Sequence, residues 1–294
     1  MPNHVKNIVI ISGPIDAVDK IVNTITTTEV DEQGVRTTCV DLNTLIPMPE
    51  SLNVVSGGPS DQCLKIYLSD IYNDKNREGE LISHISILKK YNDKQDWGYK
   101  KVDYHDLYKD KELEEAIEQT IKQHSKPCEI DSMSPVFKTR EDVIAYGKRV
   151  YDNIKTYGVK DWYDWRTYDD PSDPNNDDIG WSTKWNTYSN SMVSKTTGQE
   201  KEVSLVFQTA WNIPFKFYKK LYKLIHAEPD PVKCNIVFAD EDPGSAMGII
   251  KDIIDDRIDF VNIEAEFDED KEEYCGNAMG FYDSVWSFNC GCDE

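Results

Sequence analysis

The chain has 294 residues, of which 39% are hydrophobic and 11% aromatic, and its formal net charge at pH 7 is −21. This composition argues against an intrinsically disordered chain and allows a large core in one domain or two. No apolar stretch approaches the roughly 20 residues that cross a bilayer, and the first residues lack a secretory cleavage site. We therefore expect a cytoplasmic protein that makes no membrane contact.

The negative charge is concentrated in the last quarter of the chain. Residues 227–294 contain 19 acidic and 4 basic side chains, a net charge of −15, whereas residues 1–226 carry a net charge of −6. Nucleic acids are bound by cationic groups that displace phosphate counterions, so this distribution argues against a nucleic-acid ligand. On charge alone we favour solubility as the explanation, with attraction of a partner that has a basic surface as the alternative.

Residues 1–53 predict a strand, a helix and a second strand. The apolar run Asn7–Ser12 is closed by Gly13 and Pro14. Val35–Leu42 contains the Thr and Val residues typical of a strand. Between them, apolar residues recur at the spacing of an amphipathic helix: Ile15, Val18, Ile21, Val22 and Ile25.

Residues 54–156 predict a mostly helical insertion. Its start, Ser56–Pro59, has the composition of a loop. Thr139 and Asp142 have the spacing of a capping box, which predicts that a helix begins near Thr139. Three sets of residues recur at helical spacing: Leu81, Ile82, Ile85 and Leu88; Leu113, Ile117 and Ile121; Val143, Ile144, Gly147, Val150, Tyr151 and Ile154.

Residues 157–265 predict a return to a sheet, and residues 266–294 an acidic and aromatic C-terminal tail. Met247–Ile254 suits a helix or a buried strand, and we predict a strand because Asp255 and Asp256 can then turn the chain into the next one. The other predicted strands are Trp185–Met192, Val203–Ala210, Cys234–Ala239 and Ile258–Phe267, with a helix that starts at Pro214. Strand, helix and strand in this order form half of a ferredoxin-like fold.

Six uncommon short phrases are spread along the chain: MPNHVKN at Met1–Asn7, LNTLIPMPESL at Leu42–Leu52, WYDW at Trp162–Trp165, WSTKWN at Trp181–Asn186, FQTAWNIP at Phe207–Pro214 and FADEDPG at Phe238–Gly244. Their order resembles the YubB-type family of ferredoxin-like proteins, which is found in phages, plasmids and other mobile elements. His4 and Val5 stand where that family commonly has Trp and Cys, and Ser182 stands for a Gly. The resemblance covers about half of the chain. It implies an α+β fold with a ferredoxin-like antiparallel sheet, and it implies no established activity.

Few residues are candidates for chemistry. Asp240, Glu241 and Asp242 follow a predicted strand and offer oxygen ligands for a hard cation, but we favour the alternative that they cap a loop. None of the five histidines has the spacing of metal ligands, and no nucleophile or phosphate-loop motif occurs. We therefore predict no catalytic residue, cofactor or metal ligand, and a protein that is not an enzyme.

The tryptophans and cysteines each allow two interpretations. Trp181, Trp185 and Trp211 suit a stacking platform for bases or sugars, or a sheet core, which we favour. The seven cysteines are odd in number and dispersed, so we predict free thiols. A zinc site or an intersubunit disulfide that uses the C-terminal cysteines is the alternative.

Three observations lead to the functional hypothesis: the resemblance to a family of mobile elements, the lack of a catalytic motif and the net charge of −15 in residues 227–294. They predict a phage counter-defence protein that binds a host anti-phage complex and obstructs its access to DNA. A complex that presents a basic surface to DNA is a suitable partner for an acidic chain. We expect a nuclease–helicase of the Gabija type, because this chain resembles in type the phage inhibitor of that system. The alternatives are a metal-dependent hydrolase that uses Asp240 and Asp242, and a module that binds single-stranded nucleic acid.

Two groups of residues are assigned to this hypothesis. The predicted partner-binding residues are Asp255, Asp256, Asp259, Glu264, Glu266, Asp268, Glu269 and Asp270. Coating of a partner favours homo-oligomers, because repeated contacts raise avidity. The predicted self-association residues are Phe281, Tyr282, Trp286, Phe288, Cys290 and Cys292, with the alternative that this tail folds back on its own sheet.

Overall fold

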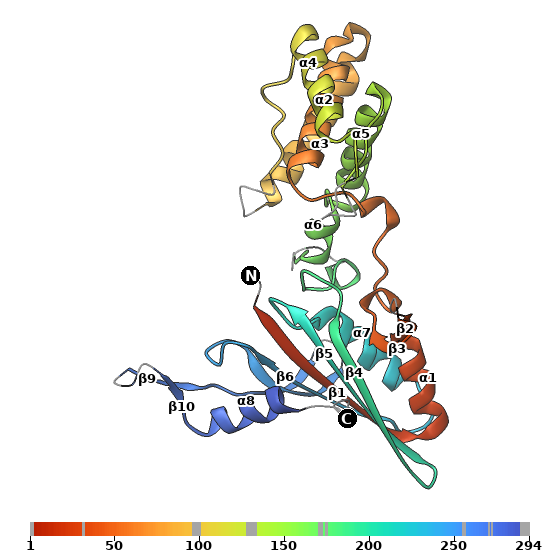
Figure 1. Cartoon of the computed structure of the whole chain (residues 1–294), viewed down its shortest axis with the longest axis vertical. Helices are drawn as coiled ribbons and strands as arrows, with labels where there is room; N and C mark the ends of the chain where they lie inside the picture. The colour runs from red at the N-terminus through yellow and green to blue at the C-terminus, as the bar shows by residue number, and fades with distance from the viewer. Residues whose placement is uncertain are drawn as a thin grey trace. The chain divides into compact units, whose positions relative to one another are not determined.

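The structure is a computed structural model with an α+β fold, and it divides into two compact units. It describes residues 3–30, 33–95, 101–127, 134–169, 173, 176–254, 257–269, 271 and 273–288. Met1–Pro47 and Asp169–Glu294 form one unit, which we call the sheet unit, and Met48–Tyr168 form the other, the helical unit (Figure 1). The helical unit thus begins and ends outside the insertion predicted at 54–156.

The sheet unit is built on a six-stranded sheet in which every neighbouring pair is antiparallel. Its order is β4-β5-β1-β6-β7-β8. The strands are β1 (His4–Pro14), β4 (Tyr188–Thr197), β5 (Glu200–Ala210), β6 (Lys233–Asp240), β7 (Met247–Ile254) and β8 (Arg257–Asn262). The prediction of a strand at Met247–Ile254 is confirmed. The single strand predicted at Ile258–Phe267 is wrong in extent, because β8 ends at Asn262.

Helices cover the two faces of this sheet. The side chain of Asn7 in β1 accepts a hydrogen bond from the hydroxyl of Tyr218 in α7 (Phe215–His226) at 2.6 Å, so it faces α7. Ile8, the next residue, packs with Ala278 and Val285 of α8 (Asn277–Ser287). Because successive strand residues point to opposite faces, α7 and α8 lie on opposite sides of the sheet.

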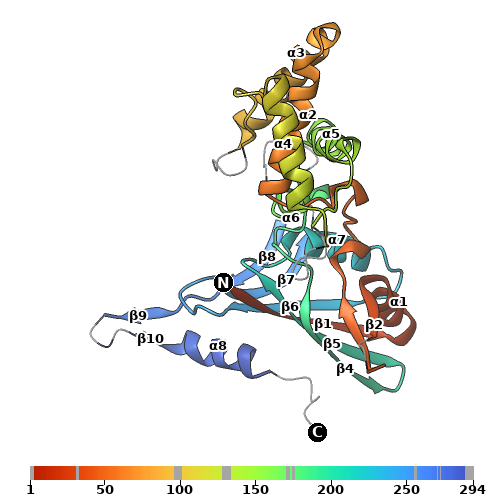
Figure 2. The same cartoon turned by 45° about the horizontal axis from the view of Figure 1, so that its top comes forward.

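Two short hairpins complete the sheet unit. Strands β2 (Thr26–Val30) and β3 (Arg36–Val40) follow α1 (Ile15–Ile25). Strands β9 (Glu266–Asp268) and β10 (Glu273–Cys275) precede α8, and Figure 2 shows this hairpin at one end of the sheet unit. The described part of the predicted acidic tail is therefore a hairpin and a helix, and neither was expected as an element.

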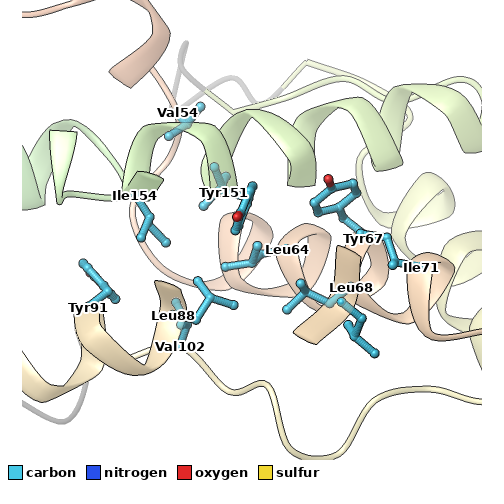
Figure 3. Packing of buried hydrophobic residues seen from close by; sticks show 12 residues of the cluster. Val54, Leu64, Tyr67, Leu68, Ile71, Leu88, Tyr91, Val102, Tyr151 and Ile154 are labelled. Carbon is cyan, nitrogen blue, oxygen red and sulfur yellow. The ribbon is translucent and has the colours of Figure 1, made fainter. Parts of the chain in front are cut away.

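Within the residues that the structure describes, the helical unit packs five α-helices around buried apolar side chains. They are α2 (Gly58–Asn73), α3 (Glu78–Lys94), α4 (Asp110–Gln123), α5 (Arg140–Tyr157) and the short α6 (Trp162–Arg166). Figure 3 shows Leu64 and Leu68 of α2, Leu88 of α3 and Tyr151 of α5 directed into one core. Thr139 caps α5 in a capping box with Asp142, which confirms the predicted helix start.

No helix in the described part of the chain is long and apolar enough to cross a membrane.

Candidate functional site

The last strand of the sheet, β8, is exposed at all six of its residues. It is held against β7 in antiparallel register, with Gly248 opposite Asn262 and Ile250 opposite Phe260. A Cβ atom at Gly248 would lie 2.4 Å from the ring of Phe260, so only glycine leaves room for that ring. The ring also stacks on that of Phe238 in β6, with centroids 6.0 Å apart and planes at 7°. These contacts fix β8 as the outer strand of the sheet.

Most of the predicted partner-binding carboxylates that the structure describes are exposed on β8 and the chain after it. We call residues 257–269 the acidic edge. Asp259, Glu264, Glu266 and Glu269 are exposed. Asp268 is half-buried, and its carboxylate lies 3.0 Å from the Nζ of Lys271. The other three predicted residues lie outside the described part of the chain: Asp255, Asp256 and Asp270.

Exposed apolar side chains lie among these carboxylates. Ile258 and Phe260 are each 42% exposed, Val261 is 39% exposed and Phe267 is 53% exposed. An open hollow of about 450 Å³ lies at one end of the edge, lined by Asp252, Ile254, Arg257, Ile258 and Asp259. The alternating pattern of the sequence predicted a strand through these apolar residues, but not that they are exposed. Apolar groups within a polar rim are typical of protein-binding surfaces.

The predicted self-association residues pack mainly within the chain. Tyr282 donates a hydrogen bond to the carbonyl of Glu241 at 2.9 Å, and the indole of Trp286 donates one to the carbonyl of Asp240 at 3.2 Å. Phe281 packs in the same cluster on the sheet, whereas Phe288 is 38% exposed. Cys290 and Cys292 lie outside the described residues.

Two of the three acidic residues at the end of β6, Asp240 and Asp242, stabilise a turn. Asp240 accepts a hydrogen bond from the backbone amide of Asp242 at 2.9 Å, and Asp242 accepts one from the amide of Gly244 at 3.0 Å. Asp240 is only 4% exposed, and this burial raises the pKa of its carboxyl group. Among the residues that the structure describes, no group of three His, Cys, Asp or Glu side chains has the geometry of a metal site.

The three tryptophans occupy different environments. Trp181 is fully buried and donates a hydrogen bond to the carbonyl of Ile46 at 2.9 Å, which confirms its predicted core position. Trp185 is half-buried. Trp211 is 44% exposed, so a core position is wrong for it. The Nζ of Lys184 lies 5.2 Å from the ring centroid of Trp185 and 4.7 Å from that of Trp211.

Four of the cysteines are free thiols: Cys39, Cys63, Cys234 and Cys275. Burial raises the pKa of Cys63 and of Cys234 to about 12, so neither is a reactive thiolate near neutral pH.

Comparison with known proteins adds no assignment. No protein-family model, curated protein or solved structure matches the chain. The function is therefore argued from the surface of the molecule, and the acidic edge is its strongest candidate site.

Proposed function

We propose that the protein is a non-enzymatic phage counter-defence protein that binds a basic surface of a host anti-phage complex and obstructs its access to DNA. The observation that carries the proposal is the acidic edge, where the carboxylates of Asp259, Glu264 and Glu266 lie exposed beside apolar side chains of β8. A nuclease–helicase of the Gabija type is the proposed partner, because it must present cationic groups to DNA. The site of action is the host cytoplasm.

The two kinds of side chain on the acidic edge have complementary roles. The carboxylates attract a cationic surface and speed encounter with it, an effect that salt weakens. The apolar side chains of Ile258, Phe260 and Val261 bury surface once contact is made and slow dissociation. A DNA-binding surface covered in this way has its cationic, phosphate-binding groups occupied, so DNA must compete for them.

The topology supports a ferredoxin-like core for this scaffold. The elements β1, α1, β4, β5, α7 and β6 follow one another as strand, helix, strand, strand, helix and strand, apart from the β2–β3 hairpin and the helical unit. In the sheet these four strands lie side by side in the order β4-β5-β1-β6. That arrangement supports assignment to the split βαβ pattern, and it is consistent with the family resemblance of the sequence phrases. Strands β7 and β8 extend it and provide the acidic edge.

Self-association through the C-terminal segment stays a prediction. Phe288 is exposed, whereas Tyr282 and Trp286 bind backbone carbonyls of the loop after β6. Light scattering of the full chain and of a chain truncated after Lys271 tests it. An unchanged subunit number after truncation would exclude this segment as the contact.

The test of the proposal is a charge reversal of the acidic edge. We expect the triple variant Asp259→Lys, Glu264→Lys, Glu266→Lys to bind a purified Gabija-type nuclease–helicase at least about 100-fold more weakly, since several close charge pairs become repulsive. It should also fail to restore phage plating on defended cells. Inhibition that survives this reversal would contradict the proposal.

A second variant controls for the change in net charge. Asp93, Glu118 and Glu141 are exposed in the helical unit, and their replacement by Lys alters the total charge by the same amount. We expect this variant to bind the complex within about threefold of the unaltered protein, because exposed charges that are not part of the contact are screened by salt. Equal losses for the two variants would show that total charge, and not the acidic edge, determines binding.

A further inference from the structure

Strand β8 presents backbone hydrogen-bonding groups on its outer side. The amide of Ile263 donates to the carbonyl of Met247 at 3.1 Å, so this pair is hydrogen-bonded across β7 and β8. In an antiparallel pair the residues bonded to the partner alternate with residues whose N–H and C=O groups point away from it. Val261 therefore bonds towards β7, whereas Phe260 and Asn262 direct their amides and carbonyls outward.

In the described part of the chain, no strand pairs with this outer side of β8. An exposed strand edge is a template for a further strand, and proteins commonly restrict it with charges and bulges. Both devices are present here. The register shifts in β7 between Ile250 and Asp252, and Asp259 lies within β8. The rest of the edge, from Phe260 to Asn262, has regular register with β7.

We propose that the outer side of β8 binds an extended, basic segment of the partner protein as a seventh strand. This inference rests on the proposed function and specifies how its partner is recognised. Backbone groups of Phe260 and Asn262 would pair with the added strand, and side chains would select its sequence. Successive residues of β8 point to opposite faces, which puts Ile258 and Phe260 on one face and Asp259 and Val261 on the other.

The two faces of β8 call for an alternating partner sequence. Apolar side chains of the added strand would pack beside Ile258 and Phe260, which are each 42% exposed. Cationic side chains on the opposite face would lie next to Asp259, and cross-strand pairs of opposite charge stabilise a sheet. The segment is therefore one in which Lys or Arg alternates with β-branched residues.

The charge of β8 disfavours a second copy of this chain on the same edge. Two β8 strands joined edge to edge would bring two acidic edges together, each with five acidic residues and one basic residue between Arg257 and Glu269. Like charges that face each other across a strand pair are destabilising. The same charges attract a basic strand, so they provide selectivity as well as affinity.

The probe for this proposal is a ten-residue peptide in which lysine alternates with valine. We expect it to bind the full-length protein and to slow amide hydrogen exchange at Phe260 and Asn262. A matched peptide with its alternate backbone amides N-methylated keeps the charge but cannot form the ladder. We expect at least about tenfold weaker binding of this matched peptide, the effect of losing hydrogen bonds that are worth about 1 kcal/mol each.

A proline variant tests the same point on the protein. Asn262→Pro removes the outward amide without removing a bond to β7, and edge strands tolerate proline at such positions. Asn262→Ala removes the same side chain, including its hydrogen bond to Glu264, but keeps the amide. We expect the proline variant to bind the lysine–valine peptide about tenfold more weakly than the alanine variant, with both melting close to the unaltered protein.

The outcomes separate this inference from the proposed function. Equal binding of the two peptides, or binding without protection at Phe260 and Asn262, would overturn strand addition. If the lysine reversals at Asp259, Glu264 and Glu266 still abolished capture of the nuclease complex in that case, the proposed function would stand with side-chain contacts alone. Pairing of two copies through β8, seen as a dimer with protected β8 amides, would also overturn the basic-strand proposal.

Discussion

The helical unit and the sheet unit differ most in how they use charge. Residues 48–168 contain 22 acidic and 19 basic side chains, a net charge of −3, whereas the sheet unit carries the remaining −18. In the helical unit, Arg140 pairs with Asp70 at 2.7 Å and Arg77 with Glu80 at 2.8 Å. Its charges are largely balanced by neighbours within the unit. The sheet unit instead has a surplus of negative charge, of which the acidic edge carries −4 from five acidic residues and one basic residue. Uncompensated negative charge is what a surface that binds a basic partner requires.

Both units bury ionisable groups, but the helical unit holds them next to one another. There Lys160 and Asp164 are each 2% exposed and Asp161 is fully buried, whereas the buried charged side chains of the sheet unit lie on three different elements: Lys6, Lys216 and Asp240. The Nζ of Lys160 lies 2.8 Å from a carboxylate oxygen of Asp61, and Tyr91 donates a hydrogen bond to Asp164 at 2.7 Å. Burial of paired charges contributes little net stability and makes a fold sensitive to pH. We therefore expect the stability of the helical unit to depend on pH through this cluster.

The largest expected effect breaks the helical unit alone. Gly147 lies where α5 crosses α2, and a Cβ atom there would meet the carbonyl oxygen of Cys63 at 2.0 Å. We expect Gly147→Ala to destabilise the helical unit by about 3 kcal/mol, because the backbone of α2 must move. Hydrogen exchange followed segment by segment measures the effect. Strands β1 and β5 should keep their protection, and their simultaneous loss would show that the two units fold as one.

A second glycine in the same unit is the control. Nothing lies within 4 Å of a Cβ atom built at Gly79 in α3. We expect Gly79→Ala to stabilise α3 by about 0.5–1 kcal/mol, since alanine loses less backbone entropy in a helix. Equal destabilisation by the two alanine substitutions would contradict the close approach of α2 and α5.

The next effect concerns the buried carboxyl of Asp161. Burial raises the pKa of this group from 3.8 to about 6. The folded state therefore binds this proton more tightly than the unfolded state does. The resulting contribution to the stability of the unit has its full value below about pH 3.8 and is lost as the pH rises through about 6. Above that pH the folded unit carries a buried charge. Asp161→Asn removes the charge and can keep the cap on the amide of Asp164.

We expect Asp161→Asn to stabilise the helical unit by about 2 kcal/mol at pH 7.5, and by about 1 kcal/mol less at pH 5, where the carboxyl of the unaltered protein is largely protonated. Thermal unfolding at the two pH values measures this difference. Asp93→Asn, at an exposed position of the same unit, is the control. A gain that does not depend on pH would mean that folding does not raise the pKa of Asp161, because the carboxyl would then lose its proton over the same pH range in both states.

Local sequence signals predicted some of these elements and missed others for identifiable reasons. The helix at Arg140–Tyr157 was predicted from the cap formed by Thr139 and Asp142, which acts within four residues. The helix at Gly58–Asn73 was missed. It begins with Gly and Pro and is buried on several sides, from Cys63 and Leu64 to Ile66 and Leu68, so it has no single apolar stripe.

The candidate site was predictable only in part for a similar reason. Counting charges located the acidic residues, and Asp259, Glu264 and Glu266 are indeed exposed. That β8 is the last strand of the sheet depends on which strands pair with β7, and this is decided by tertiary contacts such as the Phe260 ring over Gly248. The exposed position of Trp211 was missed because a tryptophan beside a strand is usually covered.

A smaller effect is expected where α8 is attached to the sheet. Lys6 in β1 is 7% exposed, and its Nζ donates to the carbonyls of Trp286 at 2.9 Å and Phe288 at 2.8 Å. A cation at the C-terminal end of a helix satisfies its last carbonyls and complements its dipole. We expect Lys6→Met to weaken the attachment of α8 by about 1–2 kcal/mol. Faster amide exchange in α8, with β1 unchanged, is the measurement.

The control for this substitution is Lys195→Met, at an exposed position of β4. It removes the same charge from the same unit without a contact to α8, so we expect unchanged exchange there. Similar acceleration in both variants would assign the effect to net charge. A loss of protection throughout the sheet in Lys6→Met would show that α8 is an integral part of the core.

The smallest expected effect concerns backbone strain, in which the two units also differ. In the described part of the chain, the three residues other than glycine with positive φ all belong to the sheet unit: Ser182, Ser189 and Trp211. Trp211 has φ 74° and its side chain is 44% exposed, so glycine removes the strain at the cost of little buried surface. We expect Trp211→Gly to be more stable than Trp211→Ala by about 1 kcal/mol, because alanine keeps the strain.

Both variants lose the contact with Lys184, so their difference in free energy of unfolding, measured by urea titration, reports the backbone strain alone. Equal stability of the two variants would mean that the turn relaxes once the indole is absent. Position 211 would then add no backbone strain to the sheet unit, and the two units would not differ there.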